Sequence, residues 1–165
     1  MRYNRAMWKR AALARLLLIA LAAAACSKPV DLKQALQVTE LSSGWFDAGI
    51  VDGKNKLVPS VTFKLRRAAG AEISAASLNV MFKNEEGEVR DEKFVQKIDF
   101  GPDGTTAPIV VRAETGYTGE PPQSRVDMLK NSQFRDVDVE ILARESAAQW
   151  VPLHKERVTR QLLTK

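Results

Sequence analysis

A two-residue alternation of apolar side chains constrains the fold of this chain more than any other feature. It is clearest over residues 57–66, where every second side chain is apolar. Successive side chains of a strand point to opposite faces of a sheet, so the pattern predicts a strand with Phe63 inside and Thr62 outside. Pro59 cannot donate a ladder hydrogen bond, and it therefore places the start of this strand at a sheet edge or a bulge.

The same alternation recurs along the chain between turn signals. Residues 78–82 and 89–100 predict a hairpin, because the segment 84–87 reads Asn-Glu-Glu-Gly and favours a turn. Only residues 124–130 are typical of a helix, with Ser124 as its N-cap. Further strands are expected at residues 35–41, 45–51, 107–113, 137–143, 149–153 and 157–163, with a turn at residues 101–104.

These segments predict one all-β domain over residues 35–165. About seven to eight short strands and one short helix, without regular alternation of strands and helices, are typical of an antiparallel β-sandwich with an immunoglobulin-like layout. The chain has a single cysteine, so the disulfide of a true immunoglobulin domain is absent. The domain must therefore be stabilised by its apolar core.

The first 25 residues predict a lipoprotein signal helix that is cleaved. They contain five basic residues and no acidic one, and an apolar run over residues 16–25 ends in four alanines directly before Cys26. This order is typical of a signal processed by signal peptidase II, after which acylated Cys26 anchors the mature chain in a lipid bilayer. Residues 26–34 then form a short tether, and about eight extended residues reach at most about 28 Å.

Two other interpretations of this segment stay open. A membrane-spanning helix needs about 20 apolar residues, roughly twice the uninterrupted run before Cys26. Ala23 and Ala25 also fit the ordinary signal peptidase, which would leave Cys26 as a free thiol. Ser27 follows the cysteine in place of aspartate, which resembles the sorting signal for the outer membrane of Gram-negative bacteria. We therefore expect a lipid-anchored protein of the outer membrane that faces the periplasm.

The charge balance argues against a nucleic acid as partner. The chain has 25 lysines and arginines and 20 aspartates and glutamates, and removal of residues 1–25 takes away five basic residues, which leaves 20 of each sign. A nucleic-acid-binding protein needs a basic surface to neutralise phosphates, and the short basic segment at residues 64–67 is the main candidate. We interpret that segment as the solvated face of a strand.

Three segments of the chain resemble FxLYD-type modules, which are small sandwich domains of bacterial surface lipoproteins. They are residues 61–65, residues 78–87 and residues 99–105, and the region 61–105 that contains them spans about a third of the mature chain. Met81, Phe82 and Lys83 stand where the family has Leu-Tyr-Asp, and Arg66 stands where it has asparagine. The resemblance implies a sandwich fold at the cell surface and a non-catalytic role, and it transfers no functional residue.

Catalytic signatures are weak. His154 is the one histidine, so a zinc site would lack further histidine or cysteine ligands. The sequence has no G-x-S-x-G elbow to supply a serine nucleophile, and residues 42–44 are expected to form a turn. Gly116 and Gly119 lack the lysine of a phosphate-binding loop, so we expect a turn at these residues. We therefore expect no enzyme activity and no cofactor.

Asp136, Asp138 and Glu140 form a carboxylate series at alternate positions of an expected strand, so their side chains project from one face. Carboxylate oxygens suit calcium, which makes these three residues weak candidates for a metal site. Calcium usually takes about six to eight oxygen ligands, several of them from turns. The alternative interpretation is a solvated face that discourages edge-to-edge pairing of sheets.

The connection over residues 115–131 is long for a sandwich and rich in glycine, proline, serine and arginine. Long ordered loops often carry function, so Tyr117 and Arg125 are candidates for a partner surface. We expect a membrane-anchored lipoprotein that acts as a non-catalytic binding or assembly module towards another envelope protein. The alternative is a lipoprotein that binds a small ligand or calcium.

Overall fold

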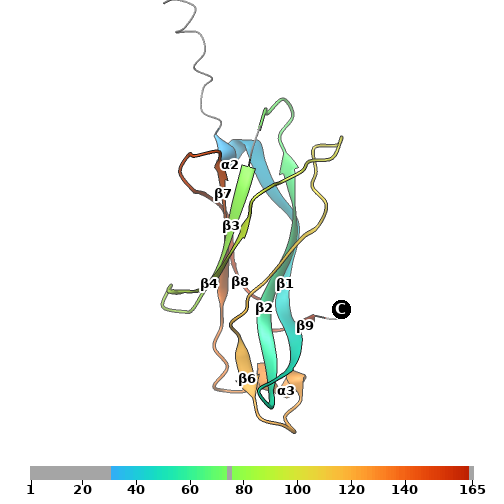
Figure 1. Ribbon diagram of the computed structural model, residues 1–165, viewed down its shortest axis with the longest axis vertical. Helices are drawn as coiled ribbons and strands as arrows, with labels where there is room; N and C mark the ends of the chain where they lie inside the picture. Colours follow the sequence, from blue (N-terminus) through green and yellow to red (C-terminus); the bar gives the residue numbers. More distant parts are fainter. Residues whose placement is uncertain (1–30, 74–75, 164–165) are drawn as a thin grey trace, which may run out of the picture.

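The computed structural model describes residues 31–73 and 76–163, which form two β-sheets packed face to face (Figure 1). The first sheet contains β1 (Leu36–Val51), β2 (Lys54–Arg67), β5 (Ile109–Arg112), β6 (Tyr117–Gly119) and β9 (Leu162–Leu163). The second sheet, in the order β4-β3-β7-β8, contains β4 (Val89–Val95), β3 (Ala76–Lys83), β7 (Asp138–Glu145) and β8 (Val151–Arg157). All strand pairs are antiparallel except β1 with β9. The predicted all-β sandwich is confirmed.

Two short helices accompany the sheets, α2 (Leu32–Ala35) and α3 (Arg125–Lys130). The Ser124 Oγ accepts a hydrogen bond from the Asp127 N–H at 3.1 Å, so the predicted N-cap of α3 is confirmed. No helix within the described residues is both long and apolar enough to cross a membrane. The predicted signal segment and Cys26 lie outside the described residues.

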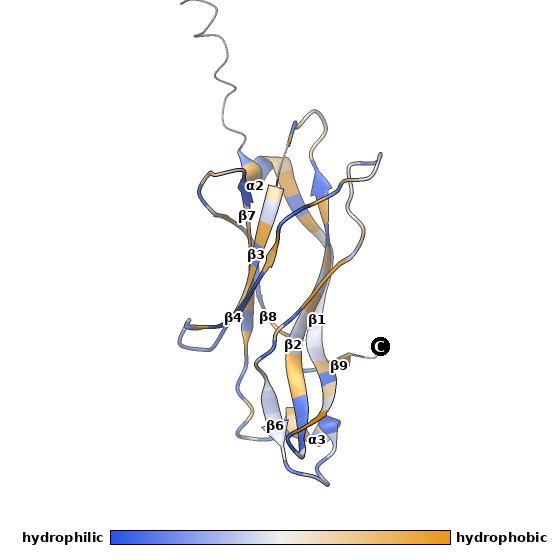
Figure 2. Cartoon of the chain, viewed as in Figure 1, coloured by the Kyte–Doolittle hydropathy of each residue, from blue (hydrophilic) through white to orange (hydrophobic). Residues whose placement is uncertain are grey.

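The apolar positions of the alternating segments face the space between the sheets. Phe63 is 0% exposed and Phe82 is 1% exposed, which confirms their predicted orientation, whereas Thr62 is half-buried. Figure 2 shows how apolar and polar residues alternate along the strands. The other large and fully buried core side chains are Trp45, Leu57, Val61, Leu65, Leu78, Val80, Met128, Val139, Ile141 and Val158.

The expected turn at residues 42–44 is wrong, because β1 runs through these positions as one strand with bulges. Their small side chains instead make room for the C-terminal segment. The Ser43 Oγ accepts a hydrogen bond from the Thr159 N–H at 3.3 Å. A Cβ on Gly44 would lie 2.8 Å from the Leu163 side chain, so only glycine lets β9 approach β1 this closely.

The sequence predicted that Pro59 marks the start of a strand at an edge or a bulge, and this prediction is wrong. Pro59 lies in the middle of β2, opposite Trp45. Its carbonyl accepts the Ala113 N–H at 2.9 Å on the other side of β2. The missing N–H of Pro59 faces that same side, where β5 has ended at Arg112 and β6 has not yet begun at Tyr117. The neighbouring strand is interrupted where β2 has no donor to offer it.

Two further predictions differ in the ends of strands. β4 ends at Val95 rather than at residue 100, while the expected turn at residues 101–104 is confirmed by a 2.9 Å hydrogen bond from the Gly104 N–H to the Gly101 carbonyl. The last two strands were expected at residues 149–153 and 157–163, but β8 continues to Arg157 and β9 contains only Leu162 and Leu163. After β8, the chain passes through the buried Val158 to the first sheet, where β9 pairs with β1.

The molecule is elongated, and its two ends differ (Figure 1). Helix α2, at the start of the described chain, lies at one end. The tip of the β1–β2 hairpin, β6 and α3 lie at the other end, where the Arg125 Nε donates to the Asp47 Oδ2 at 3.1 Å. The segment that follows the predicted tether is therefore far from the hairpin tip.

Candidate functional site

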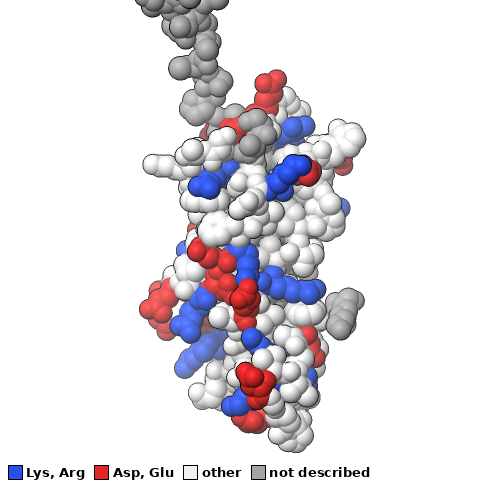
Figure 3. All heavy atoms as spheres, in the orientation of Figure 1, with Lys and Arg blue, Asp and Glu red and all other residues white. Residues whose placement is uncertain are grey.

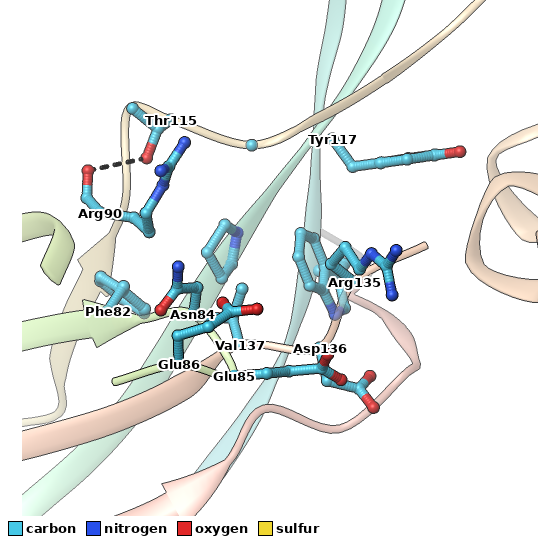
Figure 4. A pocket seen from close by; sticks show the side chains of 13 residues that line it. Phe82, Asn84, Glu85, Glu86, Arg90, Thr115, Tyr117, Arg135, Asp136 and Val137 are labelled. Carbon is cyan, nitrogen blue, oxygen red and sulfur yellow. Dashed lines mark hydrogen bonds between the residues drawn. The ribbon is translucent and has the colours of Figure 1, made fainter. Parts of the chain in front are cut away.

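A cleft of about 490 Å³ lies where the second sheet ends and the β1–β2 hairpin continues beyond it (Figure 1), and Figure 4 shows its lining residues. β1 and β2 contribute its floor, and the β3–β4 turn and the start of β4 form one wall. Residues 115–117 and 135–137 complete it. Pockets for small molecules usually have volumes of about 300 to 1,000 Å³, so this cleft is large enough for a ligand or for a side chain of a partner.

Aromatic side chains support the floor of the cleft. The Trp45 and Phe134 ring centroids are 4.5 Å apart, and those of Tyr117 and Phe134 are 5.0 Å apart, both in edge-to-face arrangements that stabilise aromatic pairs. Trp45 is 2% exposed, and its Nε1 has no hydrogen-bond partner among the described residues. Because Phe134 lies between the two other rings, the position of Tyr117 depends on the same packing as that of Trp45.

Gly116 fixes the wall next to this floor. A Cβ at this position would lie 2.0 Å from the Leu57 carbonyl oxygen, far closer than van der Waals contact. The segment between β5 and β6 therefore passes directly over β2 only because residue 116 is glycine. The sequence had identified Gly116 only as an expected turn residue, and the structure shows that close approach of two backbones requires it.

Charged side chains surround the mouth of the cleft. Arg90 and Arg135 stand on opposite sides of it, with Glu85 and Glu86 on the β3–β4 turn between them (Figure 4). Arg90, Arg135 and Glu86 are exposed, and their side chains form no ion pair with another described residue. Figure 3 shows acidic and basic side chains intermixed at the level of the β3–β4 turn. The rim thus offers both signs of charge to a ligand.

Asp136, also in the lining, is bound by basic neighbours. Its Oδ1 accepts from the Arg160 Nε at 2.6 Å, and its Oδ2 lies 3.6 Å from the Arg157 Nη1. The hydrogen bond from Arg160 holds the pKa of the Asp136 carboxyl below its usual range, and it also raises the pKa of Arg160. Asp136 is therefore charged at neutral pH and already has partners within the chain.

The other members of the carboxylate series also have basic partners. The Asp138 Oδ2 lies 3.4 Å from the Lys155 Nζ, its Oδ1 lies 3.4 Å from the Arg157 Nε, and Glu140 forms an ion pair with Lys83. No group of three histidine, cysteine, aspartate or glutamate side chains in the described ranges is arranged to hold a metal ion. The series is a row of ion pairs that begins at Asp136, just before β7, and continues along the outer face of β7 with Asp138 and Glu140, which fits the solvated-face interpretation.

Tyr117 and Arg125, the two residues proposed from the long connection, do not share one surface. Tyr117 is half-buried in β6 and lines the cleft. Arg125 begins α3, forms an ion pair with Asp47 and is not among the lining residues. The segment between residues 115 and 131 contains β6 and α3 rather than one open loop, so Arg125 holds α3 against β1.

The cleft is chemically suited to binding. Its lining contains no histidine or cysteine, and the Thr115 hydroxyl donates to the Arg90 carbonyl at 3.3 Å (Figure 4). His154 lies in β8, with its Nε2 3.4 Å from the Glu156 Oε2. A ligand could form ion pairs with the charged side chains of the rim and apolar contacts with the floor.

The sequence matches no protein-family model and no curated protein. The resemblance to FxLYD-type modules therefore stays a prediction, and the geometry of the cleft has to carry the functional argument. The sequence analysis did not identify Trp45, Arg90 or Arg135 as site residues. The one local signal was the predicted turn at residues 84–87, which places the two glutamates of the rim on an exposed tip.

Proposed function

We propose that this chain is a membrane-anchored lipoprotein that acts as a non-catalytic binding or assembly module in the bacterial envelope, with the cleft as its binding surface. The observation that carries the proposal is the set of rim charges without ion-pair partners, Arg90, Arg135 and Glu86, beside a floor of packed aromatic rings. Arginine and aromatic side chains are frequent anchors of protein interfaces. Charges of both signs on one rim favour a partner with a complementary pair.

The position of the cleft fits such an anchor. Helix α2 lies at one end of the molecule, and the turns around the cleft lie towards the other end (Figure 1). Residues 32–34 of the predicted tether form part of α2, so residues 26–31, which reach at most about 21 Å when extended, would keep α2 near the bilayer. The cleft would then point into the periplasm, where an envelope protein can reach it.

Charge reversal at the rim tests the binding surface. The full chain with Arg90→Glu and Arg135→Glu is purified from native envelopes in mild detergent, beside the wild type and a control with Lys33→Glu and Lys97→Glu. We expect the rim variant to lose envelope proteins that both other forms retain, because like charges across an interface repel. Equal recovery of those proteins with all three forms would contradict the proposal.

Replacement of the cysteine tests the anchor. Cys26→Ser cannot form the thioether to a diacylglycerol, so we expect an unprocessed precursor or release of the domain from the outer-membrane fraction. Unchanged mass and unchanged fractionation would contradict the lipoprotein assignment. The result is independent of the rim variants, because it reports where the chain is held and not what it binds.

A small ligand is the second candidate, and the volume of the cleft favours it. Native mass spectrometry of the full chain, released from detergent micelles, would show a ligand as a mass increment beyond the lipid modification. A ligand in the cleft should be lost in Tyr117→Ala and kept in Arg125→Ala, since only Tyr117 lines the cleft. A calcium ligand would instead be revealed by its loss on chelation.

A further inference from the structure

Three charged side chains on the rim of the cleft are exposed and have no ion-pair partner in the part of the chain that the structure describes. They are Arg90, Glu86 and Arg135. Figure 4 shows the two arginines on opposite sides of the cleft, with Glu86 of the β3–β4 turn between them. Across the cleft, the free charges of the rim therefore alternate in sign, in the order positive, negative, positive.

The other two carboxylates of the lining have a cation of the same chain close by. The Asp136 Oδ1 accepts a hydrogen bond from the Arg160 Nε at 2.6 Å. This hydrogen bond raises the pKa of Arg160, and the charge of Glu85 adds to the rise, so Arg160 acts on both carboxylates. Glu85 and Asp136 therefore have less charge to offer a ligand than Glu86 has.

The backbone that carries the three free charges is held in place by contacts within the chain. In the β3–β4 turn, the Asn84 Oδ1 accepts a hydrogen bond from the Glu88 N–H at 2.8 Å. The Arg90 carbonyl accepts a hydrogen bond from the Thr115 hydroxyl at 3.3 Å. Arg135 directly follows the buried phenylalanine that packs between the other two rings of the floor. A ligand therefore has little backbone to order when it binds, which favours affinity.

We infer, on the basis of the proposed function, that the cleft binds an extended segment of a partner protein whose alternate side chains are acidic, basic and acidic. Successive side chains of an extended segment point to opposite sides, so every second side chain lies on one face, about 7 Å from the next. Such a face brings one carboxylate to each of Arg90 and Arg135 and one cation to Glu86. Complementary charges of this kind select the partner and fix its register.

The chemistry of the lining suits this order of side chains. Arginine can hold a carboxylate with two parallel hydrogen bonds, which adds geometric specificity to the charge attraction. A lysine or arginine in the middle position would lay its aliphatic stem over the apolar floor, which includes Pro59 and Val137, while its charged end reaches Glu86. A small zwitterion with one carboxylate and one ammonium group would leave one of the two arginines without a partner. The extended segment accounts for all three charges.

Selection from a peptide library tests the charge order. The baits are the full chain in detergent micelles and the same chain with Glu86→Arg, Arg90→Glu and Arg135→Glu. The probe is a phage library of short random peptides, displayed in many copies so that weak contacts add up. Wild type should enrich the order acidic, basic, acidic at least about tenfold over the order basic, acidic, basic, because like charges across an interface repel. The triple reversal should show the opposite preference.

Lys97→Glu is the matched control, because it changes the net charge of the chain as much as the triple reversal does and lies outside the lining. It should enrich the same order as wild type. Melting curves followed by circular dichroism show whether the triple reversal is folded. If it is not, Arg135→Glu alone is the second variant, and it should remove the preference for one of the two acidic positions.

Selection of no charge order by wild type, or of the same order by wild type and the triple reversal, would overturn the inference. So would enrichment of a single acidic residue without the alternation. The envelope pull-down with Arg90→Glu and Arg135→Glu separates this result from the proposed function. If that variant loses envelope proteins while wild type selects no charge order, the cleft is a binding surface for a partner of different chemistry. If neither effect is seen, both proposals are wrong.

Discussion

The cleft and the outer face of β7 are built from the same kinds of charged residue and use them differently. Along β7, Asp138 and Glu140 each face a basic side chain of a neighbouring strand. Around the cleft, Arg90, Arg135 and Glu86 are exposed without an ion-pair partner in the described part of the chain. Charges that satisfy one another have little left to offer a ligand. Whether the charges are paired within the chain, rather than how many carboxylates there are, separates the structural row on β7 from the candidate site.

One shared apolar core holds both the cleft and the outer face of β7 in place. Phe63→Ala should cost about 3 to 5 kcal/mol of unfolding free energy, because it removes a fully buried ring from a domain without a disulfide. Thr62→Ala, at the next and half-buried position, should cost far less. Melting curves followed by circular dichroism compare the two. An equal loss of stability in the two variants would contradict the register of β2, which places Phe63 in the core and Thr62 on the opposite face.

The wall of the cleft should be the most sensitive part of its backbone. Gly116→Ala forces a Cβ against the Leu57 carbonyl, so we expect a loss of about 1 to 3 kcal/mol together with a displaced wall. Thr118→Ala, exposed in β6, is the matched control and should be nearly neutral. Chemical denaturation measures both variants. A harmless Gly116→Ala would show that the segment between β5 and β6 does not pass so close to β2.

Asp136 belongs to both regions, since it lines the cleft and pairs with Arg160 and Arg157. Its folded pKa lies below the ordinary value of 3.8, so the charged carboxylate stabilises the fold above that value, and the contribution is lost as the pH falls through the lowered pKa. Asp136→Asn should remove about 0.5 kcal/mol at neutral pH, a modest figure because the arginines are solvent-exposed.

Unfolding free energies measured from pH 7 down to pH 2 provide the readout for this variant. The difference between the wild type and Asp136→Asn should shrink as the pH falls through the lowered pKa of Asp136, because the carboxylate then becomes protonated in the folded chain as well as in the unfolded chain. A constant difference between the two proteins over the whole range would show that the variant acts through packing. The ion pair with Arg160 would then have no part in stability.

The smallest expected effect concerns calcium. Replacing the carboxylate series by Asp136→Asn, Asp138→Asn and Glu140→Gln should leave the response to calcium unchanged, because each carboxylate already has a basic partner. Neither wild type nor variant should show a higher melting temperature in millimolar calcium. A rise of several degrees in the wild type that the triple change abolishes would show that these paired carboxylates bind calcium, and the paired row would then be a binding site as well.

The strands could be predicted because their signal is local. The alternation around Phe63 and Phe82 and the cap at Ser124 each depend on neighbours within a few residues. The wrong predictions, a turn at residues 42–44 and a strand start at Pro59, concern positions whose structure depends on segments distant in the sequence. Small residues and proline usually interrupt a strand. Here Gly44 leaves space for β9, and Pro59 faces the gap between β5 and β6.

The candidate site was harder to predict because it is assembled from five separate parts of the chain. Trp45, Arg90 and Arg135 are far apart in the sequence and carry no common spacing. Tyr117 could be selected by its place in a long connection, but the same reasoning selected Arg125, whose partner Asp47 lies on another strand. Which charges stay unpaired depends on the register of the sheets, and no local pattern encodes that register.

A photoreactive side chain placed at the rim of the cleft shows whether an envelope protein binds there. A benzoylphenylalanine at Glu86, exposed on the rim, is compared with one at Arg66, exposed on β2 and outside the lining, in full chains held in native envelopes. The cleft account predicts a discrete crosslinked product from position 86 and none from position 66, with loss of the product when Arg90→Glu and Arg135→Glu are added. A product from position 66 alone, or one that survives the reversal at the rim, would contradict it.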